Sequence, residues 1–158
     1  WPHDFDLEYK LTLSRKLTLA LRTKNTGTES CSFTEGFHPY FRVRDISSIS
    51  LKGLDGVERI DFEGSRIVEA GKREHVILDP GLRRALAMVS RGNSKCVVWN
   101  PGPIVDDTWQ NLKPGDERNF LCLEPANIPR EKAVTLAPGE EHTLVCAIQS
   151  TQDSSEKA

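Results

Sequence analysis

The sequence has little of what membrane proteins and nucleic-acid-binding proteins need. None of its 158 residues belongs to an apolar run near the roughly 18 residues that cross a bilayer, and no basic and apolar signal segment opens it. Its 21 Lys and Arg residues are balanced by 23 Asp and Glu residues and lie scattered along the chain. The sequence therefore predicts no membrane span, no nucleic-acid surface and no acidic interaction tail.

Cysteine is also sparse, and none of its four residues has a neighbour at metal-binding spacing. They lie far apart, mostly in apolar, strand-like stretches: Cys31, Cys96, Cys122 and Cys146. Neither a CxxC pair, nor a two-histidine metal spacing, nor a phosphate-cradling glycine loop is present. We therefore predict no metal, no cofactor, buried free thiols and a cytoplasmic location, where thiols stay reduced.

What the chain has instead is period-two alternation of apolar residues, broken by frequent turns. Apolar residues fall at every second position over 5–13 and again over 17–21, which predicts a β-hairpin. About ten to twelve such short strands follow one another, with turn residues about every 8–12 positions and almost no helical pattern. The sequence therefore predicts an all-β protein, an antiparallel β-sandwich, with one domain over residues 1–150 and a polar, disordered tail over 151–158.

Four segments carry more specific expectations. Residues 57–62 have the pattern of a short strand, and the run 96–99, apolar on both faces, predicts a central strand covered on both sides. Residues 134–136 and 142–148 flank a turn and predict a final hairpin. Residues 104–117 form the one region expected to be helical or irregular.

The stretch Gly36-Phe37-His38-Pro39-Tyr40-Phe41 places one titratable side chain in a short aromatic run. A histidine in such a run is commonly a packed structural residue. The proline and the rings also make the place stiff and partly desolvated, which holds the imidazole in one orientation with a pKa near neutrality or below. A general acid working near pH 7 needs both properties, so His38 is a candidate catalytic acid.

Glu124 follows the apolar strand 120–123 and precedes Pro125, so we expect it where that strand ends. One interpretation is an exposed acid at the start of a loop. The other is a carboxylate that is fixed by a rigid backbone and partly buried, whose raised pKa suits a general base. His38 and Glu124 are therefore the candidate acid–base pair.

Two other pairs of neighbours are weaker candidates. Glu74-His75 opens the strand 76–78 from a charged loop, where solvated side chains are the ordinary outcome. Trp99-Asn100 ends a buried strand and could place an indole and an amide at the rim of a cleft, although a packed indole is the more common outcome. His3 and His142 have no convergent partners in the sequence, and we assign them no role.

Three of these stretches together resemble a known family. The order and spacing of His38-Pro39-Tyr40-Phe41, Trp99-Asn100-Pro101 and Cys122-Leu123-Glu124-Pro125 are similar to those of the aldose 1-epimerase (galactose mutarotase-like) superfamily. The closest resemblance is to its glucose-6-phosphate 1-epimerase branch, which the stretches 1–7 and 136–140 also resemble. Each motif alone is weak, but the ordered set is fairly specific.

The resemblance implies part of a β-supersandwich that interconverts α and β anomers of a hexose or hexose 6-phosphate without metal or cofactor. By motif, Glu124 matches the family base, which removes the proton of the C1 hydroxyl, and His38 matches the acid, which protonates the ring oxygen. Glu74 matches the place of a sugar-binding aspartate but is one methylene longer. Trp99 and Asn100 are expected to line the substrate site.

The resemblance also implies that part of the family domain is missing here, so that this chain is either a fragment of a longer protein or a chain that has lost part of the sandwich. Family members carry a segment before the stretch that matches 1–7, with a second active-site histidine and phosphate-binding basic residues, so this chain resembles roughly the C-terminal three-fifths of the domain. Several strands would then have open edges, and we expect another chain or an N-terminal segment to cover them. Two alternatives to a hexose-6-phosphate mutarotase remain: a non-catalytic carbohydrate-binding or interaction sandwich, and an aldose 1-epimerase for unphosphorylated sugars.

Overall fold

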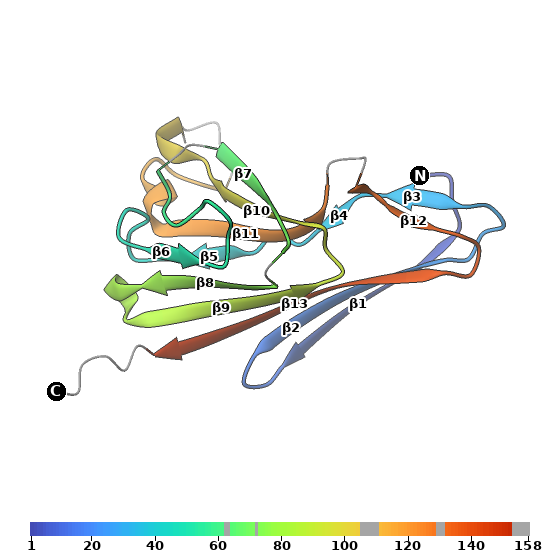
Figure 1. Cartoon of the computed structure of the whole chain (residues 1–158), viewed down its shortest axis with the longest axis horizontal. Helices are drawn as coiled ribbons and strands as arrows, with labels where there is room; N and C mark the ends of the chain where they lie inside the picture. The colour runs from blue at the N-terminus through green and yellow to red at the C-terminus, as the bar shows by residue number, and fades with distance from the viewer. Residues whose placement is uncertain (62–63, 72, 105–110, 129–131, 153–158) are drawn as a thin grey trace.

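The chain folds as two facing β-sheets with a small third sheet at one end (Figure 1). The computed structural model describes residues 1–61, 64–71, 73–104, 111–128 and 132–152. Every strand pair in it is antiparallel. The predicted all-β antiparallel sandwich is therefore confirmed.

The larger sheet has six strands, and the smaller facing sheet is built on one long strand. In sheet order, the larger consists of β1 (Phe5–Leu13), β2 (Leu17–Asn25), β13 (Glu141–Gln152), β9 (Arg84–Arg91), β8 (Glu74–Asp79) and β6 (Ser50–Lys52). The facing sheet consists of β4 (Glu35–Gly36), β11 (Phe120–Asn127), β10 (Lys95–Asn100) and β7 (Gly64–Glu69), with β5 (Tyr40–Arg42) also paired to β11. The third sheet pairs β3 (Cys31–Phe33) with β12 (Val134–Leu136). Short 3₁₀ turns among the described residues include η1 (Pro80–Leu82), η2 (Gly102–Ile104) and η3 (Asp116–Asn119).

The core lies between the two main sheets. Alternation sends Leu121 and Leu123 of β11 inward, where they are completely buried, against residues such as Ile77 and Met88 of the facing sheet. Burying a side chain of this size contributes about 1.5–3 kcal/mol. The even-numbered residues of β11 consequently point to the opposite face of the smaller sheet, and that face carries the candidate site.

The expected hairpin at 5–13 and 17–21 is confirmed, as is the central position of 96–99, since β10 pairs with both β11 and β7. The expected final hairpin is wrong: β12 pairs with β3, whereas β13 pairs with β2 and β9. The turn between 136 and 141 therefore connects two sheets, which the alternation pattern cannot distinguish from a hairpin.

Residues 57–61 form no strand, contrary to expectation, and residue 62 lies outside the described residues. The Val57 amide donates a hydrogen bond to the Leu54 carbonyl, so these residues form a turn. Both side chains are buried in the core. The segment 104–117, predicted to be helical or irregular, contains parts of two 3₁₀ turns. Residues 105–110 lie outside the described residues. Strand β13 continues to Gln152, so residues 151 and 152 belong to a strand and not to the predicted tail. Residues 153–158 lie outside the described residues.

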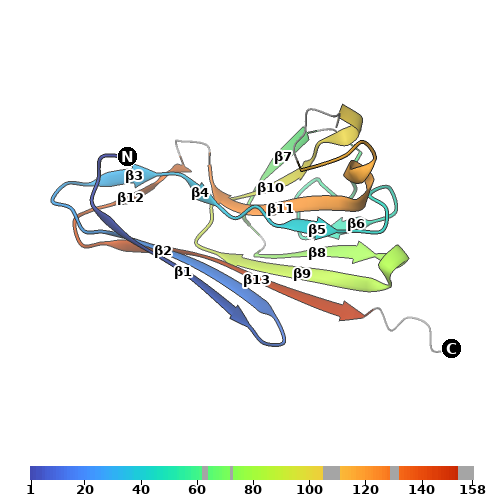
Figure 2. The same cartoon turned by 180° about the vertical axis from the view of Figure 1, so that it is seen from behind.

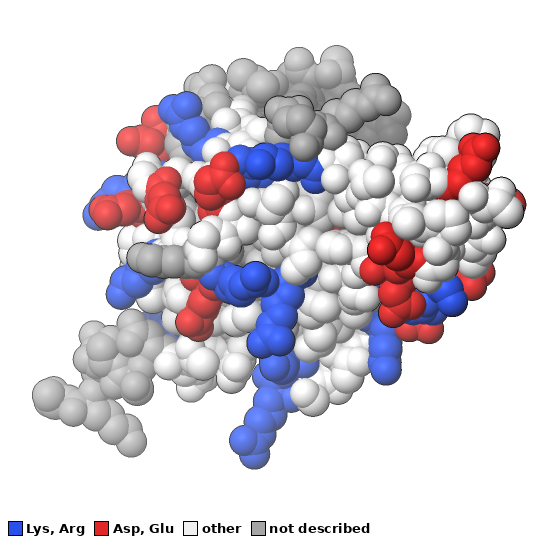
Figure 3. Space-filling view, turned by 45° about the vertical axis from the view of Figure 1, so that its right-hand side comes forward, with Lys and Arg blue, Asp and Glu red and all other residues white. Residues whose placement is uncertain are grey.

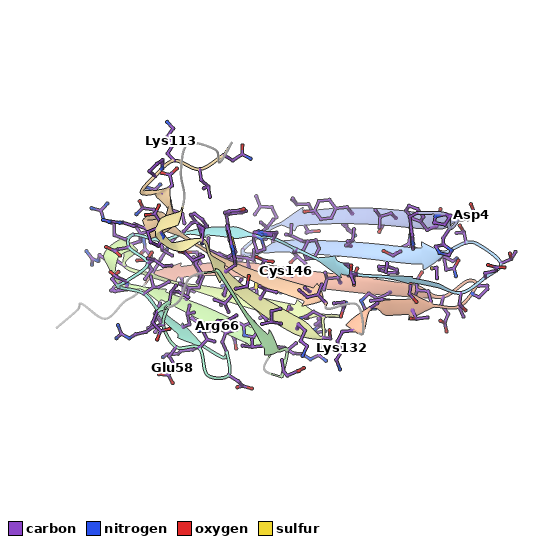
Figure 4. All side chains as sticks on the ribbon, turned by 90° about the horizontal axis from the view of Figure 1, so that it is seen from above. Asp4, Glu58, Arg66, Lys113, Lys132 and Cys146 are labelled. Carbon is purple, nitrogen blue, oxygen red and sulfur yellow. The ribbon has the colours of Figure 1, made fainter. Side chains whose placement is uncertain are left out.

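Among the described residues, the smaller of the two main sheets does not cover strand β1 (Figure 4). All nine of its residues are exposed, and its apolar face includes Leu7, Tyr9 and Leu11, each 57% exposed. Seen from the side of the smaller sheet, β1 and β2 lie beside that sheet rather than beneath it (Figure 4). The β3–β12 pair lies over one end of β1 and β2 (Figure 2). Strand β1 is also the terminal strand of its sheet, so among the described residues its edge away from β2 is open.

No helix among the described residues has the length and hydropathy needed to cross a bilayer. Charges of both signs are interspersed on the face shown in Figure 3.

Candidate active site

The site begins with a break in strand pairing. Strands β4 and β5 both pair with β11, with Gly36 opposite Ala126 and Tyr40 opposite Cys122. The two pairings share one register, so His38, in the gap between them, faces Glu124. Side chains at opposite positions of an antiparallel pair lie close enough to interact. The strand register thus brings together two residues that are far apart in the chain.

Proline explains why pairing stops here. Pro39 on one side and Pro125 on the other lack the amide hydrogen that a strand ladder needs, and the Phe37 amide makes the last bond, to the Pro125 carbonyl, at 3.1 Å. Just before the gap, a β-carbon on Gly36 would lie 3.1 Å from that of Ala126, so glycine permits the close approach of the two strands. The residues in the gap are therefore held by the paired strands β4 and β5 on either side, but they are not themselves part of a strand pair.

The sequence predicts Glu124 at the end of its strand. Glu124 instead lies inside the strand, because β11 continues through Pro125 to Asn127. The Nε2 atom of His38 lies 3.1 Å from Oε1 of Glu124, and the two side chains are 50% and 15% exposed, respectively. Burial raises the pKa of Glu124 above the ordinary value of a glutamate, and the charge of His38 opposes that rise. The predicted base is thus sheltered and fixed by its strand.

The His38 side chain is half exposed, and aromatic rings cover the rest of it. Its ring stacks on Tyr40, with centroids 4.9 Å apart and planes at 22°, and meets Trp99 edge-on at 5.7 Å. Phe120 supports both neighbours, at 5.2 Å from Tyr40 and 5.7 Å from Trp99. The rings fix the orientation of the imidazole while leaving one side accessible to a ligand.

The buried histidine of this chain is His75, which is fully buried. Its Nδ1 lies 3.0 Å from the carbonyl oxygen of Gly53, and burial lowers its pKa. It faces the core from β8, and its neighbour Glu74 therefore faces the outside of the six-stranded sheet. Glu74 does not join His38 and Glu124, which lie on the other sheet.

Asn100 is part of the scaffold. Its side-chain amide donates to the carbonyl oxygens of Glu117 (2.8 Å) and Phe120 (2.9 Å), and its Oδ1 accepts from the Gly102 amide (2.9 Å). Both donor hydrogens are used within the protein, so a substrate would receive none. Trp99 is the predicted substrate-site residue that does lie beside the acid–base pair.

Tyr40 and Cys122 were not singled out in the sequence, yet both lie at the site. The Cys122 sulfur, the Glu124 carboxylate and the His38 imidazole all lie within 4.8 Å of one another. Period-two alternation could have identified Cys122, because a residue two positions before Glu124 in a strand shares its face.

A second carboxylate–imidazole pair joins the sheets elsewhere. The Oε1 atom of Glu35 on β4 lies 2.9 Å from Nε2 of His142 on β13. The side-chain amide of Asn127 on β11 donates a hydrogen bond of 2.9 Å to the same oxygen. Asn127 also donates to the Gly92 carbonyl and accepts from the Ser94 amide. Burial raises the pKa of Glu35. We interpret this cluster as a clamp between sheets; His142, to which no role was assigned, is part of it.

The geometry at His38 and Glu124 suits paired proton transfer. A sheltered carboxylate can accept a proton from a hydroxyl group, and an accessible imidazolium next to it can donate one to another oxygen of the same ligand. The described residues place rings on one side of the pair, which suits a ligand with a flat face.

Comparisons with known proteins identify the family of this chain. A family model described as aldose 1-epimerase matches residues 1–69 and 59–149. A Cenchrus ciliaris protein named "Putative glucose-6-phosphate 1-epimerase" is 32% identical over 163 aligned positions, covering 89% of this chain and 49% of that protein. An Escherichia coli K12 protein of the same name is 25% identical, with coverage of 85% and 50%.

Solved structures show the same fold. The chain superposes with a TM-score of 0.85 on a Salmonella typhimurium protein named "putative mutarotase (YeaD)", at 21% identity and with coverage of 96% of this chain and 55% of that one. For the Slr1438 protein of Synechocystis the TM-score is 0.75 at 20% identity. The chain spans about half the length of the curated relatives it matches.

Proposed function

Because the chain belongs to the aldose 1-epimerase family, we propose that it supplies the acid–base pair of a sugar mutarotase, with Glu124 as the base and His38 as the acid. The observation that carries this proposal is the 3.1 Å contact between Nε2 of His38 and Oε1 of Glu124, with the carboxylate sheltered and the imidazole accessible. An exposed acid and an aligned base are what a ring-opening reaction at a hemiacetal requires.

In the proposed reaction, the Glu124 carboxylate takes the proton of the C1 hydroxyl while the His38 imidazolium gives a proton to the ring oxygen. The bond between C1 and the ring oxygen breaks, which leaves an open-chain aldehyde and a protonated Glu124. Rotation about the C1–C2 bond presents the other face of the aldehyde, and the reverse proton transfers close the ring. Both groups return to their starting states, and no oxidant or cofactor is consumed.

The substrate we propose is a hexose 6-phosphate, following the names of the two curated relatives. Arg42 supports this choice: alternation along β5 places it on the same face as Tyr40, and it lies opposite Phe120. A guanidinium can bind phosphate through two parallel hydrogen bonds. A cytoplasmic location, where sugar phosphates and free thiols both occur, is part of the same proposal.

Anomer exchange measured by NMR on glucose 6-phosphate, glucose and galactose tests the proposal. We expect exchange above the buffer rate, fastest with the phosphorylated sugar, and a loss of about 10²–10⁴-fold in Glu124→Gln. Glu58→Gln, an exposed loop glutamate, is the matched control and should keep the wild-type rate. No exchange above background by the folded protein would refute the enzyme, and equal rates for all sugars would refute the phosphate preference.

A sugar-binding module without turnover is the second candidate. The 56% exposed Tyr40 beside the pair favours it, because an exposed aromatic ring offers a stacking surface without requiring proton transfer. Calorimetric binding of glucose 6-phosphate with no exchange would support this candidate, whereas exchange that Glu124→Gln abolishes would eliminate it.

A further inference from the structure

Cys122 adds a third kind of donor to the acid–base pair. Strand alternation turns its side chain toward the same face as Glu124, and it lies opposite Tyr40 in the strand pairing. The His38 nitrogen, the Cys122 sulfur and a Glu124 oxygen all lie within 4.8 Å of one another. The other cysteines of the smaller sheet and β13, Cys96 and Cys146, face the core instead.

These three donors match the ligands of zinc. Zinc binds nitrogen and oxygen at about 2.0–2.2 Å and thiolate sulfur at about 2.3 Å, so donors around a tetrahedral ion are about 3.3–3.6 Å apart. The nitrogen–oxygen distance of 3.1 Å is already near that value. The remaining distances, at most 4.8 Å, need to shorten by about 1 Å, which a change of side-chain rotamers can provide.

Access to the donors is uneven. Cys122 is fully buried and Glu124 is partly so, whereas the His38 side chain is half exposed. An ion would therefore meet the imidazole first and reach the sulfur by separating His38 from Glu124. Three protein donors leave a fourth tetrahedral position for water or another ligand.

We propose that His38, Cys122 and Glu124 form a binding site for zinc and similar thiophilic divalent ions, and that metal binding there inhibits the enzyme. The inhibition rests on the proposed function, since the ion occupies the imidazole lone pair and the carboxylate oxygen that proton transfer uses. The sulfur donor makes the site selective: Zn²⁺, Cd²⁺ and Co²⁺ suit it, whereas Mg²⁺ and Ca²⁺ prefer all-oxygen sites.

Cobalt spectroscopy tests the site independently of catalysis. Co²⁺ added to the 158-residue chain should produce a near-ultraviolet thiolate-to-cobalt band and visible bands of tetrahedral intensity, and Zn²⁺ should abolish them. Cys122→Ser should remove the ultraviolet band and weaken Zn²⁺ binding at least about tenfold. Cys146→Ser, an equally buried thiol in the core, is the matched control and should retain both.

A thiolate band that persists in Cys122→Ser, or is lost in Cys146→Ser, would overturn the site. So would Zn²⁺ binding of equal strength in the wild type and Cys122→Ser, because the ion would then not use the sulfur.

The inhibition is measured separately, as anomer exchange on glucose 6-phosphate with EDTA or with buffered free Zn²⁺, each variant being compared with its own rate in EDTA. Zn²⁺ should inhibit the wild type and Cys146→Ser at concentrations at least about tenfold lower than Cys122→Ser. Exchange that is insensitive to bound Zn²⁺ would overturn the inhibition. No exchange even in EDTA would refute the proposed function and with it the inhibition, while the cobalt spectrum would still decide whether the metal site exists.

Discussion

His38 and Glu124 occupy opposite positions of an antiparallel strand register at the point where two prolines interrupt it. Their Nε2 and Oε1 atoms are 3.1 Å apart, yet the exposed fractions of the two side chains are 50% and 15%. Burial raises the pKa of the sheltered Glu124 carboxyl, which suits a general base, while the exposed imidazole can reach a ligand. The proposed roles and the first three predictions below depend on this pair.

Glu124→Gln should lose more activity than His38→Asn. Both single changes are expected to cost about 10²–10⁴-fold in anomer exchange, but only loss of the carboxylate removes the group that starts ring opening. Exchange rates at saturating glucose 6-phosphate would be compared for folded proteins, with circular dichroism as the folding control. A loss at Glu124 equal to or smaller than that at His38 would mean that the roles are assigned wrongly.

The acid limb of the pH–rate profile should lie above the ordinary pKa of a glutamate. Burial raises the pKa of Glu124, and the base must be ionised to act, so kcat/KM should fall as pH drops through that raised value. In His38→Asn the residual activity should show this limb at still higher pH, because the charge that lowers the pKa of Glu124 has been removed. A limb at or below 4.5 in the wild type would contradict the assignment.

Tyr40 should act by holding the His38 ring. Aromatic pairs contribute about 0.5–1.5 kcal/mol, so Tyr40→Ala should lower kcat/KM by about two- to tenfold, whereas Tyr40→Phe should preserve the stack and most of the activity. The ¹H–¹⁵N spectrum of the His38 imidazole gives a second readout, which should show a freer ring only in Tyr40→Ala. If Phe and Ala reduced the rate equally, the hydroxyl rather than the stack would be responsible.

The Glu35 clamp should make stability depend on pH. Burial raises the folded-state pKa of Glu35, so its stabilising contribution is present below its unfolded pKa and is lost as pH rises through the folded value. Relative to wild type, Glu35→Gln should therefore become more stable as the pH rises from 4 to 7. Urea unfolding across this range would measure the difference, and a change of opposite sign would show that ionised Glu35 is favoured by folding.

The uncovered face of β1 should make the isolated chain self-associate. Contiguous apolar patches of this kind are rarely left in water by monomers, so we expect a second copy of the chain to cover this face. Leu7→Lys combined with Leu11→Lys should shift the chain toward monomer in analytical ultracentrifugation. Thr12→Lys, exposed on the same strand but on its polar face, should not. A wild-type chain that is already monomeric at high concentration would refute this expectation.

The sequence by itself determined the class of fold, and it supplied the two residues that we propose as the acid–base pair. Period-two alternation and turn residues are local properties, and they sufficed for the strands of the first hairpin and the central position of 96–99. The resemblance that selected His38 and Glu124 rests on short motifs, each readable without knowing what lies beside it. Local pattern also misled, because residues 57–62 alternate like a strand although 57–61 form none. A strand such as β11 can also continue through Pro125 where its partner strand is interrupted.

Only the tertiary structure decided which side chains meet. The approach of His38 to Glu124 depends on the register of β4 and β5 along β11, and that register depends on interactions between distant segments. For the same reason Cys122 lies at the site, whereas Glu74 lies on the outside of the other sheet. The Asn100 side-chain amide donates its hydrogen bonds to backbone carbonyl groups. Side chains far apart in the sequence come together only through strand pairing and sheet packing, and no local pattern records these.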